Sequence, residues 1–355
     1  MQPTTVPDAG QVFPPLDRQL GIEGEYWSER VVREMVWLSG KLPYGDVEDV
    51  MARLGHMYCS KSSIWRRCQV WGARMKEFEE QRRVQAMALP SLWTVWPQVP
   101  AEERKRMGVS MDGTMVHVRG EGWKELKVGC IHEVGVEQIW DNTLGEAVKQ
   151  ACARENSYIA HLGGPREFGE LLWSEARRRG WETALDSQVI GDGASWIWNL
   201  AALHFGESHQ VVDWYHATEH LRDATKLLIG ESEPTFERRY QAMETSLFQG
   251  HARTLAEALQ RSNPKESQYK DALNREAHYF RHHQRRMNYL ELREGHWLIG
   301  SGSVECEAKQ FKHRLTASGM RWSRTGIENL IPIRAAVMGD RFQEIWEQAK
   351  AIPQN

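Results

Sequence analysis

Apolar residues at helical spacing dominate the N-terminal part of the chain. Val31, Met35 and Leu38 recur every three to four residues, which is typical of an amphipathic helix. The pattern predicts three short helices, over residues 23–40, 47–54 and 62–71.

The link between the second and third helices resembles the turn of a helix-turn-helix, with Gly55 as a left-handed cap. The third helix would then present Lys61, Arg66 and Arg67 to DNA. A small helical bundle without a nucleic-acid function has the same pattern, so both interpretations stay open. Prolines then interrupt any helix, and we expect residues 89–105 to form a linker.

The periodicity changes to strand-like alternation after the linker. Residues 107–118 and 123–134 are rich in strand-forming side chains, and Gly120 and Gly122 between them predict a hairpin. Alternation places Asp112, Thr114, Val116 and Val118 on one face of the first strand. The following segments predict a strand at 157–161, a helix at 166–179, a strand ending at Asp192, a helix at 195–203 and a strand at 209–214.

The order β-β-β-α-β-α-β is that of an RNase H-like domain. The fold class is therefore expected to be α/β, or α+β, with an RNase H-like mixed sheet, a helical insertion and a preceding helical region. The expected divisions are a flexible N-terminus (1–22), a helical DNA-binding region (23–88), a linker (89–105), the first part of the core (106–216), an all-helical insertion (217–300) and a C-terminal helical part that completes the catalytic core (301–355).

Composition narrows the choice of partners only in part. The net charge of the 355 residues is −3, whereas binding to phosphates depends on clustered Lys and Arg. Such clusters occur within 61–83 and 281–324, although solvated helix faces are the alternative. No apolar run is long enough for a membrane span and no secretory signal is evident, so we expect a cytoplasmic, nucleoid-associated protein. Five cysteines without a C-x-x-C pair argue against disulfides and a zinc ribbon.

Two aspartates have the placement that phosphodiester chemistry requires. Asp112 lies within the first predicted strand and Asp192 ends the fourth, and these strands neighbour each other in an RNase H-like sheet. Taken alone, an Asp-Gly after a strand is more often a turn or a helix cap. Carboxylates are the ligands that hard divalent cations prefer, and two such ions can activate a nucleophile and stabilise the leaving oxygen.

A third carboxylate is available in the C-terminal part. Ser303 can cap a helix with an apolar face formed by Val304, Ala308, Phe311 and Leu315. Glu305 and Glu307 flank that face on opposite sides. The spacing therefore does not choose between them, and either acid could simply favour the positive end of the helix.

Four blocks, in this order, resemble the ISKra-type insertion-sequence transposases, relatives of the Mutator-like group: SMDGTMVHVRGEGWKELKVG, VIGDGASWIWNL, VDWYHATEHL and GSGSVECEAKQFKHRLTASGMRW. The resemblance spans about residues 13–340. It implies a catalytic triad of Asp112, Asp192 and Glu305 that binds two Mg²⁺ or Mn²⁺ ions. It also implies metal-dependent cleavage at transposon ends and strand transfer into target DNA.

The resemblance extends to an accessory pair. The Mutator-like group has a C/D-x-x-H signature after the second aspartate, and Asp213 and His216 match it. His216 would contact DNA or orient the active site. The alternative is a local helix cap and hydrogen bond between these two residues.

The implied partners are the terminal inverted repeats and the target DNA, bound by a homo-oligomer because two ends must be joined. The candidate DNA contacts near the third acid are Lys309, Lys312, Arg314, Arg321 and Trp322. Trp322 is the best candidate for stacking on a base, whereas most of the sixteen tryptophans are expected in the core. The basic, His-rich run 281–286 would track phosphates or form a solvated helix face.

Two other kinds of protein fit part of the pattern. A structure-selective nuclease of the same fold, such as a resolvase, would cut branched DNA without strand transfer. A non-catalytic DNA-binding regulator would use the helix-turn-helix and would not need the three carboxylates.

Overall fold

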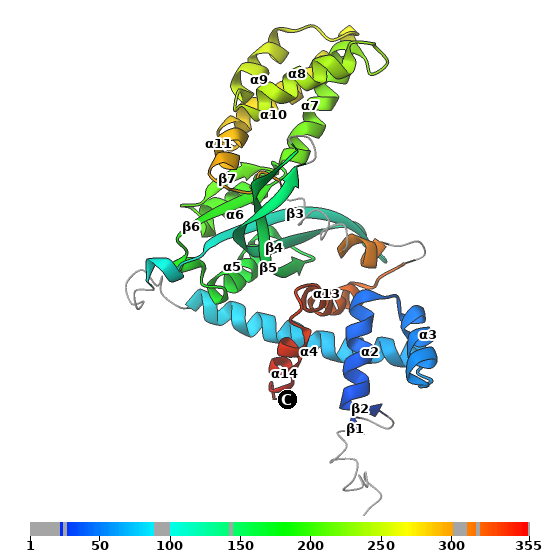
Figure 1. Cartoon of the computed structure of the whole chain (residues 1–355). Helices are drawn as coiled ribbons and strands as arrows, with labels where there is room; N and C mark the ends of the chain where they lie inside the picture. The colour runs from blue at the N-terminus through cyan, green and yellow to red at the C-terminus, as the bar shows by residue number, and fades with distance from the viewer. Residues whose placement is uncertain are drawn as a thin grey trace, which may run out of the picture.

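The computed structural model describes residues 22–23, 27–88, 100–141, 145–300, 311–316 and 320–353. In Figure 1 these parts form a column, with a helical layer at the top, a sheet in the middle and a second group of helices below. None of the helices in the described ranges is both long enough and apolar enough to cross a membrane.

The central sheet has five strands in the order β5-β4-β3-β6-β7. The strands are β3 (Arg106–Val118), β4 (Gly122–Asp141), β5 (Glu146–His161), β6 (Asp186–Gly191) and β7 (His209–Val212). β4 is antiparallel to both β3 and β5, whereas β6 is parallel to β3 and β7. The predicted order of elements and the RNase H-like mixed sheet are confirmed. Gly120 and Gly122 have φ angles of 78° and 75° and form the predicted turn, because glycine has no Cβ to oppose positive φ.

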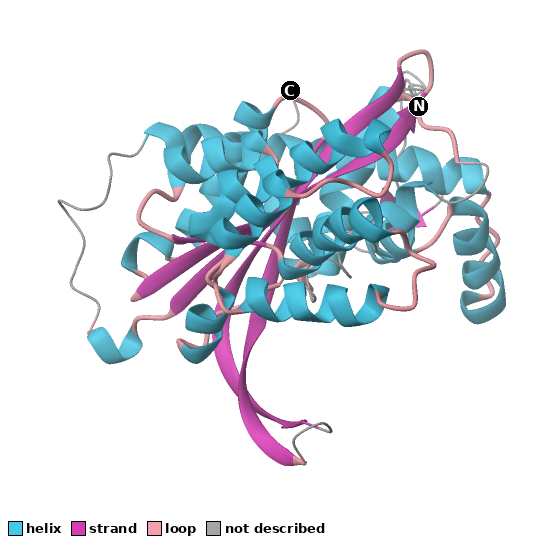
Figure 2. Ribbon diagram, turned by 90° about the horizontal axis from the view of Figure 1, so that it is seen from above, coloured by secondary structure: helices cyan, strands magenta, loops and turns pink. Residues whose placement is uncertain are grey.

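β4 and β5 are longer than predicted. Their pairing continues from Glu133↔Arg154 to Asp141↔Glu146, so the third strand begins before the expected 157. We call residues 133–141 and 146–154 the ribbon, which projects from the body of the molecule in Figure 2. Its side chains are mostly exposed, including 64% of Trp140. Alternation is weak where both faces are exposed, so the sequence predicted only the buried part of these strands.

Helices α5 (Pro165–Arg178) and α6 (Ser195–His204) cover one face of the sheet. Pro165 is favourable in the first turn of α5, because a backbone N–H at that position would find no carbonyl partner within the helix. The buried side chains of this layer include Met107, Val109, Phe168 and Leu172. This layer buries one face of β3 up to Met111, the residue before Asp112.

Helix α13 (Arg324–Met338) covers the other face. Its Ile327 and Leu330 share a core with Val116 and Val118, which confirms that the alternating residues of β3 face one side. The far side of α13 packs on α2 (Glu29–Lys41) and α4 (Lys61–Ala88). α4 and α13 approach so closely that a Cβ on Gly72 would lie 2.0 Å from the carbonyl oxygen of Asn329.

The N-terminal helices and the C-terminal helices share one core. The elements are the short strands β1 (Ile22–Glu23) and β2 (Trp27–Ser28), then α2, α3 (Tyr44–Gly55) and α4, with α14 (Phe342–Lys350) from the end of the chain. Trp71 of α4 stacks on Trp346 of α14 at 3.4 Å between ring centroids. The described residues after 310 therefore contribute helices that pack both on the sheet and on the N-terminal region.

The N-terminal predictions need three corrections. The first helix begins at Glu29, after β2, because Ser28 caps it by accepting from the Val31 N–H. The third helix continues for 28 residues, since its apolar positions find partners in α2, α13 and α14. The left-handed residue after α3 is His56, with φ 51°, rather than Gly55.

The predicted helical insertion is confirmed. It consists of α7 (Trp214–Ile229), α8 (Phe236–Phe248), α9 (Ala252–Arg261), α10 (Lys270–His283) and α11 (Tyr289–Glu294), which form the top layer in Figure 1. The chain then returns along the sheet, where the Gln188 side chain bonds both the N–H and the carbonyl of Leu298. The Trp214 N–H donates to the Ile299 carbonyl at 3.0 Å, so this return segment reaches the beginning of α7.

Candidate active site

Three aspartates lie at the same level of three adjacent parallel strands. Met111 of β3 pairs with Gly191 of β6, which in turn pairs with Val212 of β7. Each of these residues is followed directly by an aspartate: Asp112, Asp192 and Asp213. Neighbouring strands are about 4.8 Å apart, so the register brings the three carboxylates to one edge of the sheet. We call them the acid row.

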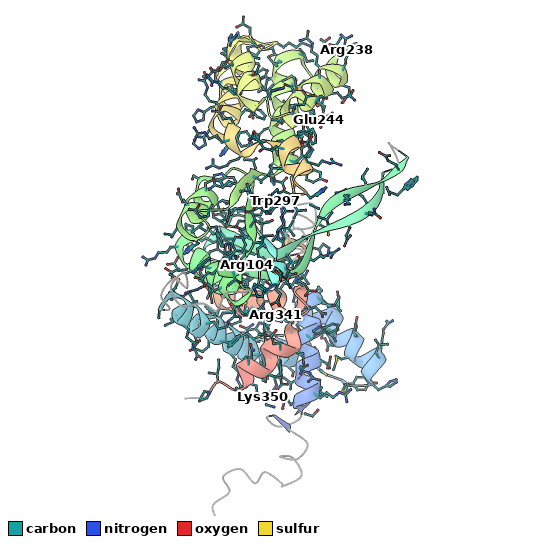
Figure 3. The ribbon with its side chains drawn as sticks, turned by 60° about the vertical axis from the view of Figure 1, so that its left-hand side comes forward. Arg104, Arg238, Glu244, Trp297, Arg341 and Lys350 are labelled. Atoms are coloured by element: carbon teal, nitrogen blue, oxygen red, sulfur yellow. The ribbon has the colours of Figure 1, made fainter. Side chains whose placement is uncertain are left out.

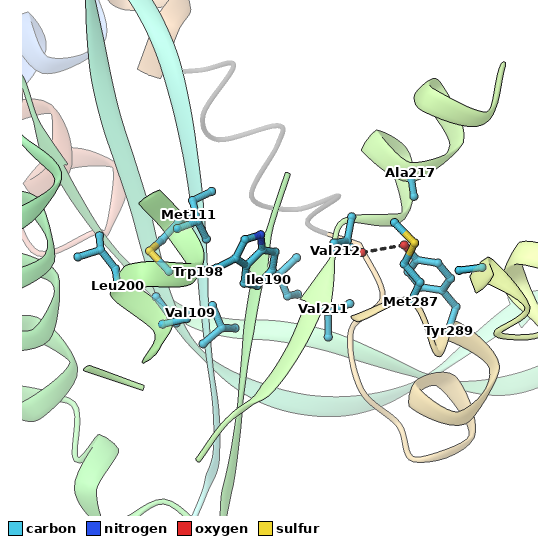
Figure 4. Close-up of a cluster of buried hydrophobic side chains, with 14 of the residues drawn as sticks. Val109, Met111, Ile190, Trp198, Leu200, Val211, Val212, Ala217, Met287 and Tyr289 are labelled. Atoms are coloured by element: carbon cyan, nitrogen blue, oxygen red, sulfur yellow. Dashed lines mark hydrogen bonds between the residues drawn. The ribbon is translucent and has the colours of Figure 1, made fainter. Parts of the chain in front are cut away.

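The hydrophobic core fixes the backbone just before the acid row. Met111 and Val212 are buried, and Figure 4 shows them on either side of Ile190 in one apolar cluster. The Tyr289 hydroxyl donates to the Val212 carbonyl at 3.0 Å, the dashed line of Figure 4. The carboxyl ends of parallel strands are where open α/β sheets bind ligands.

The three carboxylates differ in what they bond. Asp112 Oδ1 accepts the Gly113 N–H and Asp192 Oδ1 accepts the Ala194 N–H, both at 2.7 Å, and both residues are partly exposed. Asp213 is 1% exposed and caps α7, because its Oδ1 accepts the N–H groups of Tyr215 and His216. Asp112 and Asp192 are therefore accessible to a ligand, whereas the buried Asp213 carboxylate caps α7.

His216 carries the positive charge beside the acid row. Its Nδ1 lies 3.6 Å from Asp213 Oδ1, an ion-pair distance, and its side chain is 30% exposed. The Asp213 carboxylate, with smaller contributions from Asp192 and Asp112, raises the pKa of His216 to about 9 against the opposing effect of burial. The imidazole is therefore protonated at neutral pH. The helix cap expected for Asp213 is confirmed. The carboxylates of Asp192 and Asp112 also contribute to the raised pKa of His216.

The donor set fits a divalent cation in part. Asp112 and Asp192 are hard oxygen ligands on adjacent strands, and Mg²⁺ is commonly held by one or two protein carboxylates together with substrate phosphates. In the described part of the chain, no group of three or more His, Cys, Asp or Glu side chains is arranged to hold a metal. The third predicted ligand, Glu305, and its neighbour Glu307 lie outside the described residues.

The helical insertion contacts the loop that carries Asp192. The Tyr279 hydroxyl of α10 donates to the Asp192 carbonyl at 3.0 Å. The Tyr279 ring stacks on His220 at 3.7 Å, and His220 is bonded in turn to Glu276 at 2.7 Å. A Cβ on Gly193, which has φ 112°, would lie 2.8 Å from the Tyr279 ring. Nothing in the sequence marks Tyr279, because the contact joins residues 87 positions apart.

The basic, His-rich run at the end of α10 divides into two kinds of side chain. Arg281, His282 and Arg285 are exposed. His283 is buried, and Arg286 bonds Gln210 while its guanidinium lies over the Trp198 ring. Burial, with the nearby His282 and Arg286, lowers the pKa of His283 to about 4. Part of this run therefore docks the insertion onto the sheet instead of facing solvent.

The N-terminal candidates for DNA binding are at the beginning of α4. Lys61 and Arg66 are exposed and Arg67 is partly exposed, so the helix presents these cations as predicted. Tyr58, in the preceding turn, is 89% exposed, and Trp65 is 43% exposed on the same short segment. Their contact with DNA stays a prediction.

Two C-terminal candidates are core residues. Arg314 is 2% exposed because its Nε donates to the Ser39 carbonyl at 2.9 Å, near the end of α2. Trp322 is 8% exposed, and its Nε1 donates to the Leu315 carbonyl at 2.7 Å. Both side chains are buried, and their contact with DNA stays a prediction. Their basic neighbours in the sequence indicated a surface position, so the packing of these two side chains in the core was not predicted.

Two of the other C-terminal candidates for DNA contact are exposed cations. Lys312 and Arg321 are exposed, and Lys309 lies outside the described residues. Phe311 and Leu315 are buried against the sheet, as the apolar face predicted.

The fold and the acid row thus define an RNase H-like protein with a carboxylate site. The model of the Uncharacterised protein family (UPF0236) matches residues 167–349, more than half of the chain, and the chain belongs to this family. The matched range includes Asp192, Asp213 and Glu305, whereas Asp112 lies upstream of it. No curated protein matches the chain.

Proposed function

We propose that this protein is a DNA transposase that uses divalent cations to cleave phosphodiester bonds, specifically an insertion-sequence transposase of the ISKra type. The observation that supports the proposal most is the acid row, in which Asp112 and Asp192 follow paired positions of adjacent strands. The resemblance of the four sequence blocks supplies the transposase class and the third acid, Glu305.

In this proposal three of the acids bind metal and the fourth positions a histidine. Asp112, Asp192 and Glu305 hold two Mg²⁺ or Mn²⁺ ions. When bound, these ions would activate the attacking oxygen and stabilise the leaving oxygen of an in-line displacement. Asp213 orients His216, whose protonated ring provides positive charge at the position where the scissile phosphate would lie. Cleavage would release a 3′-hydroxyl, which then attacks the target strand.

The partners follow from the same proposal. The cations Lys61, Arg66, Lys312 and Arg321 are exposed and would bind the phosphates of the terminal repeats and of the target. Because two transposon ends must be brought together, we propose that the protein acts as a homo-oligomer on DNA. Its proposed location is the bacterial nucleoid.

The decisive assay uses purified protein and DNA that carries the ends of its own element, with Mg²⁺, Mn²⁺ or EDTA. We expect metal-dependent cleavage and joined products, both lost in Glu305→Ala and retained in Glu307→Ala. Glu307 is a matched control because it is two residues away and has the same charge. The reverse result for the two variants would move the third ligand to Glu307.

Two other results would contradict the proposal. Binding without cleavage in any metal would indicate a regulator. Cutting of branched DNA irrespective of the end sequence, without joined products, would indicate a nuclease of the same fold.

A further inference from the structure

A groove of about 730 Å³ lies between the ribbon and the helical insertion. One wall is formed by residues 149–153 of β5, and the opposite walls come from the first turn of α7, from α8, from Arg293 of α11 and from the return segment 297–300. Glu244 and Trp297, both labelled in Figure 3, belong to the insertion side of this groove. Its volume is typical of small-ligand sites.

The groove adjoins the acid row. Tyr215 lines it and follows Asp213 by two residues, and the Tyr215 N–H donates to Asp213 Oδ1 at 2.7 Å. Gly300 lies against the Tyr215 ring, since a Cβ there would be 3.4 Å from a ring carbon. The acid-row residues do not line the groove, but its wall begins at Trp214, the residue after Asp213, so a ligand on Tyr215 would lie next to the end of the acid row.

The lining combines an available aromatic ring with positive charge. Tyr215 is 52% exposed, whereas the neighbouring Trp214 ring is held edge-on against Tyr289 at 4.7 Å. Lys149 and Arg293 are exposed on different walls, and neither forms an ion pair with another described residue. The acid among the described lining residues, Glu244, already accepts the Tyr240 hydroxyl at 3.0 Å.

We propose that this groove binds an unpaired nucleotide of the DNA strand next to the scissile phosphate. The base stacks on Tyr215, and the flanking phosphates contact Lys149 and Arg293. The groove takes a single strand rather than a duplex because its volume is that of a small-ligand site. Glu146 is exposed on the ribbon, and its negative charge opposes the approach of a second phosphate backbone.

This inference rests on the proposed function, and a binding assay without metal separates the two. Fluorescence anisotropy in EDTA would measure the affinity of the full chain for a labelled single-stranded oligonucleotide and for its duplex. We expect Tyr215→Ala to weaken single-strand binding about tenfold or more, because stacking contributes ~1–3 kcal/mol per base. Tyr215→Phe should keep that affinity, and duplex binding should change little in either variant.

Two further variants make the test specific. Lys149→Ala with Arg293→Ala should reduce the slope of log affinity against log salt by about 1.4, at ~0.7 per phosphate contact on a single strand. Tyr269→Ala is the matched control, because Tyr269 is 40% exposed in the insertion and does not line the groove.

Unchanged single-strand affinity in Tyr215→Ala, or an equal loss of duplex affinity, would overturn the inference even if the protein cleaves DNA. Conversely, selective loss of single-strand binding without metal-dependent cleavage would retain the groove and refute the catalytic proposal.

Discussion

The acid row and the cluster around Glu175 are two carboxylate sites with opposite charge balance. Glu175, on α5, is 1% exposed and is bonded by three arginines: Arg82 at 2.8 Å, Arg178 at 2.6 Å and Arg341 at 2.7 Å. Burial alone would raise the pKa of Glu175, but the bond from Arg178 and the three positive charges lower it to about 2. In the acid row, three aspartates share one protonated histidine.

The difference separates a structural site from a proposed catalytic one. The Glu175 cluster joins α4, α5 and the N-cap of α14, and its buried carboxylate accepts hydrogen bonds from all three arginines. Among the described residues, the acid row has three carboxylates against one protonated histidine, an excess of negative charge, and two of these carboxylates, Asp112 and Asp192, are partly exposed. Such an excess is unfavourable unless a cation neutralises it, which is the physical reason for assigning metal binding there.

The largest expected effect is on catalysis by the acid row. We expect Asp112→Asn and Asp192→Asn each to lower cleavage of end-bearing DNA by on the order of 10³-fold, because bound metal contributes several kcal/mol to catalysis. The temperature of thermal unfolding should be unchanged or slightly higher, since each substitution removes one of the neighbouring negative charges. Asp186→Asn is the control, because Asp186 starts the same strand β6 and pairs with His209 at its exposed edge. Wild-type cleavage by either site variant would refute that residue's role.

The second expected effect is on stability at the Glu175 cluster. Glu175→Gln leaves three arginines without their shared carboxylate and should lower the free energy of unfolding by about 3–5 kcal/mol, measured by denaturant titration. Glu257→Gln, whose ion pairs are on the surface, should leave the free energy of unfolding nearly unchanged. The Glu175 contribution is present above the ordinary pKa of 4.5 and is lost as pH falls through about 2. Equal effects of the two variants would remove the distinction between a buried cluster and surface pairs.

The third expected effect has the opposite pH dependence. Because its pKa is raised from 6.5 to about 9, His216 stabilises the fold fully below pH 6.5, and this contribution is lost as pH rises through about 9. Asp213→Asn preserves a capping oxygen but removes the charge, so the pKa of His216 should fall. Titration of His216 by NMR would measure both values. A pKa near 6.5 in the wild-type protein would show that the acids do not act on this ring.

The smallest expected effect concerns the contact between the insertion and the Asp192 loop. Tyr279→Phe removes one hydrogen bond of about 1 kcal/mol, and we expect kcat for cleavage to fall about fivefold with little change in KM. Tyr240→Phe is the matched control, since it removes a hydroxyl bonded to Glu244 within the same insertion. Similar kcat values for the two variants would show that the Tyr279 contact does not position the loop.

The acid row was largely predictable because its signals are local. Asp112 lies within β3, Asp192 and Asp213 directly follow short apolar strands, and the order of strands along the chain places the first two acids on neighbours. Asp213 was predicted only as an accessory residue, since the alignment of β7 with β6 depends on pairing between strands. Glu305 and Glu307 remain alternatives that spacing does not separate.

The Glu175 cluster, the ribbon and Tyr279 were not predicted because each depends on contacts between distant parts of the chain. Glu175 meets arginines from α4 and α14, and no periodicity relates these positions. The burial of Trp322 was not predicted either, because its neighbours in sequence are basic, whereas its indole donates to the Leu315 carbonyl within the core. Local patterns therefore predicted the strands and the positions of the acids on them, whereas tertiary packing decides which charged and aromatic residues face solvent.

Binding of Mn²⁺ to the purified full chain, measured by isothermal titration calorimetry, tests the central claim most directly. We expect saturable binding that is at least about tenfold weaker in Asp112→Asn and in Asp192→Asn, since even loss of an outer partner of a ligand weakens metal sites 10- to 100-fold. Asp186→Asn should bind as the wild type does. Equal binding by all four proteins, or no binding at millimolar Mn²⁺, would contradict the assignment of the acid row as a metal-dependent active site.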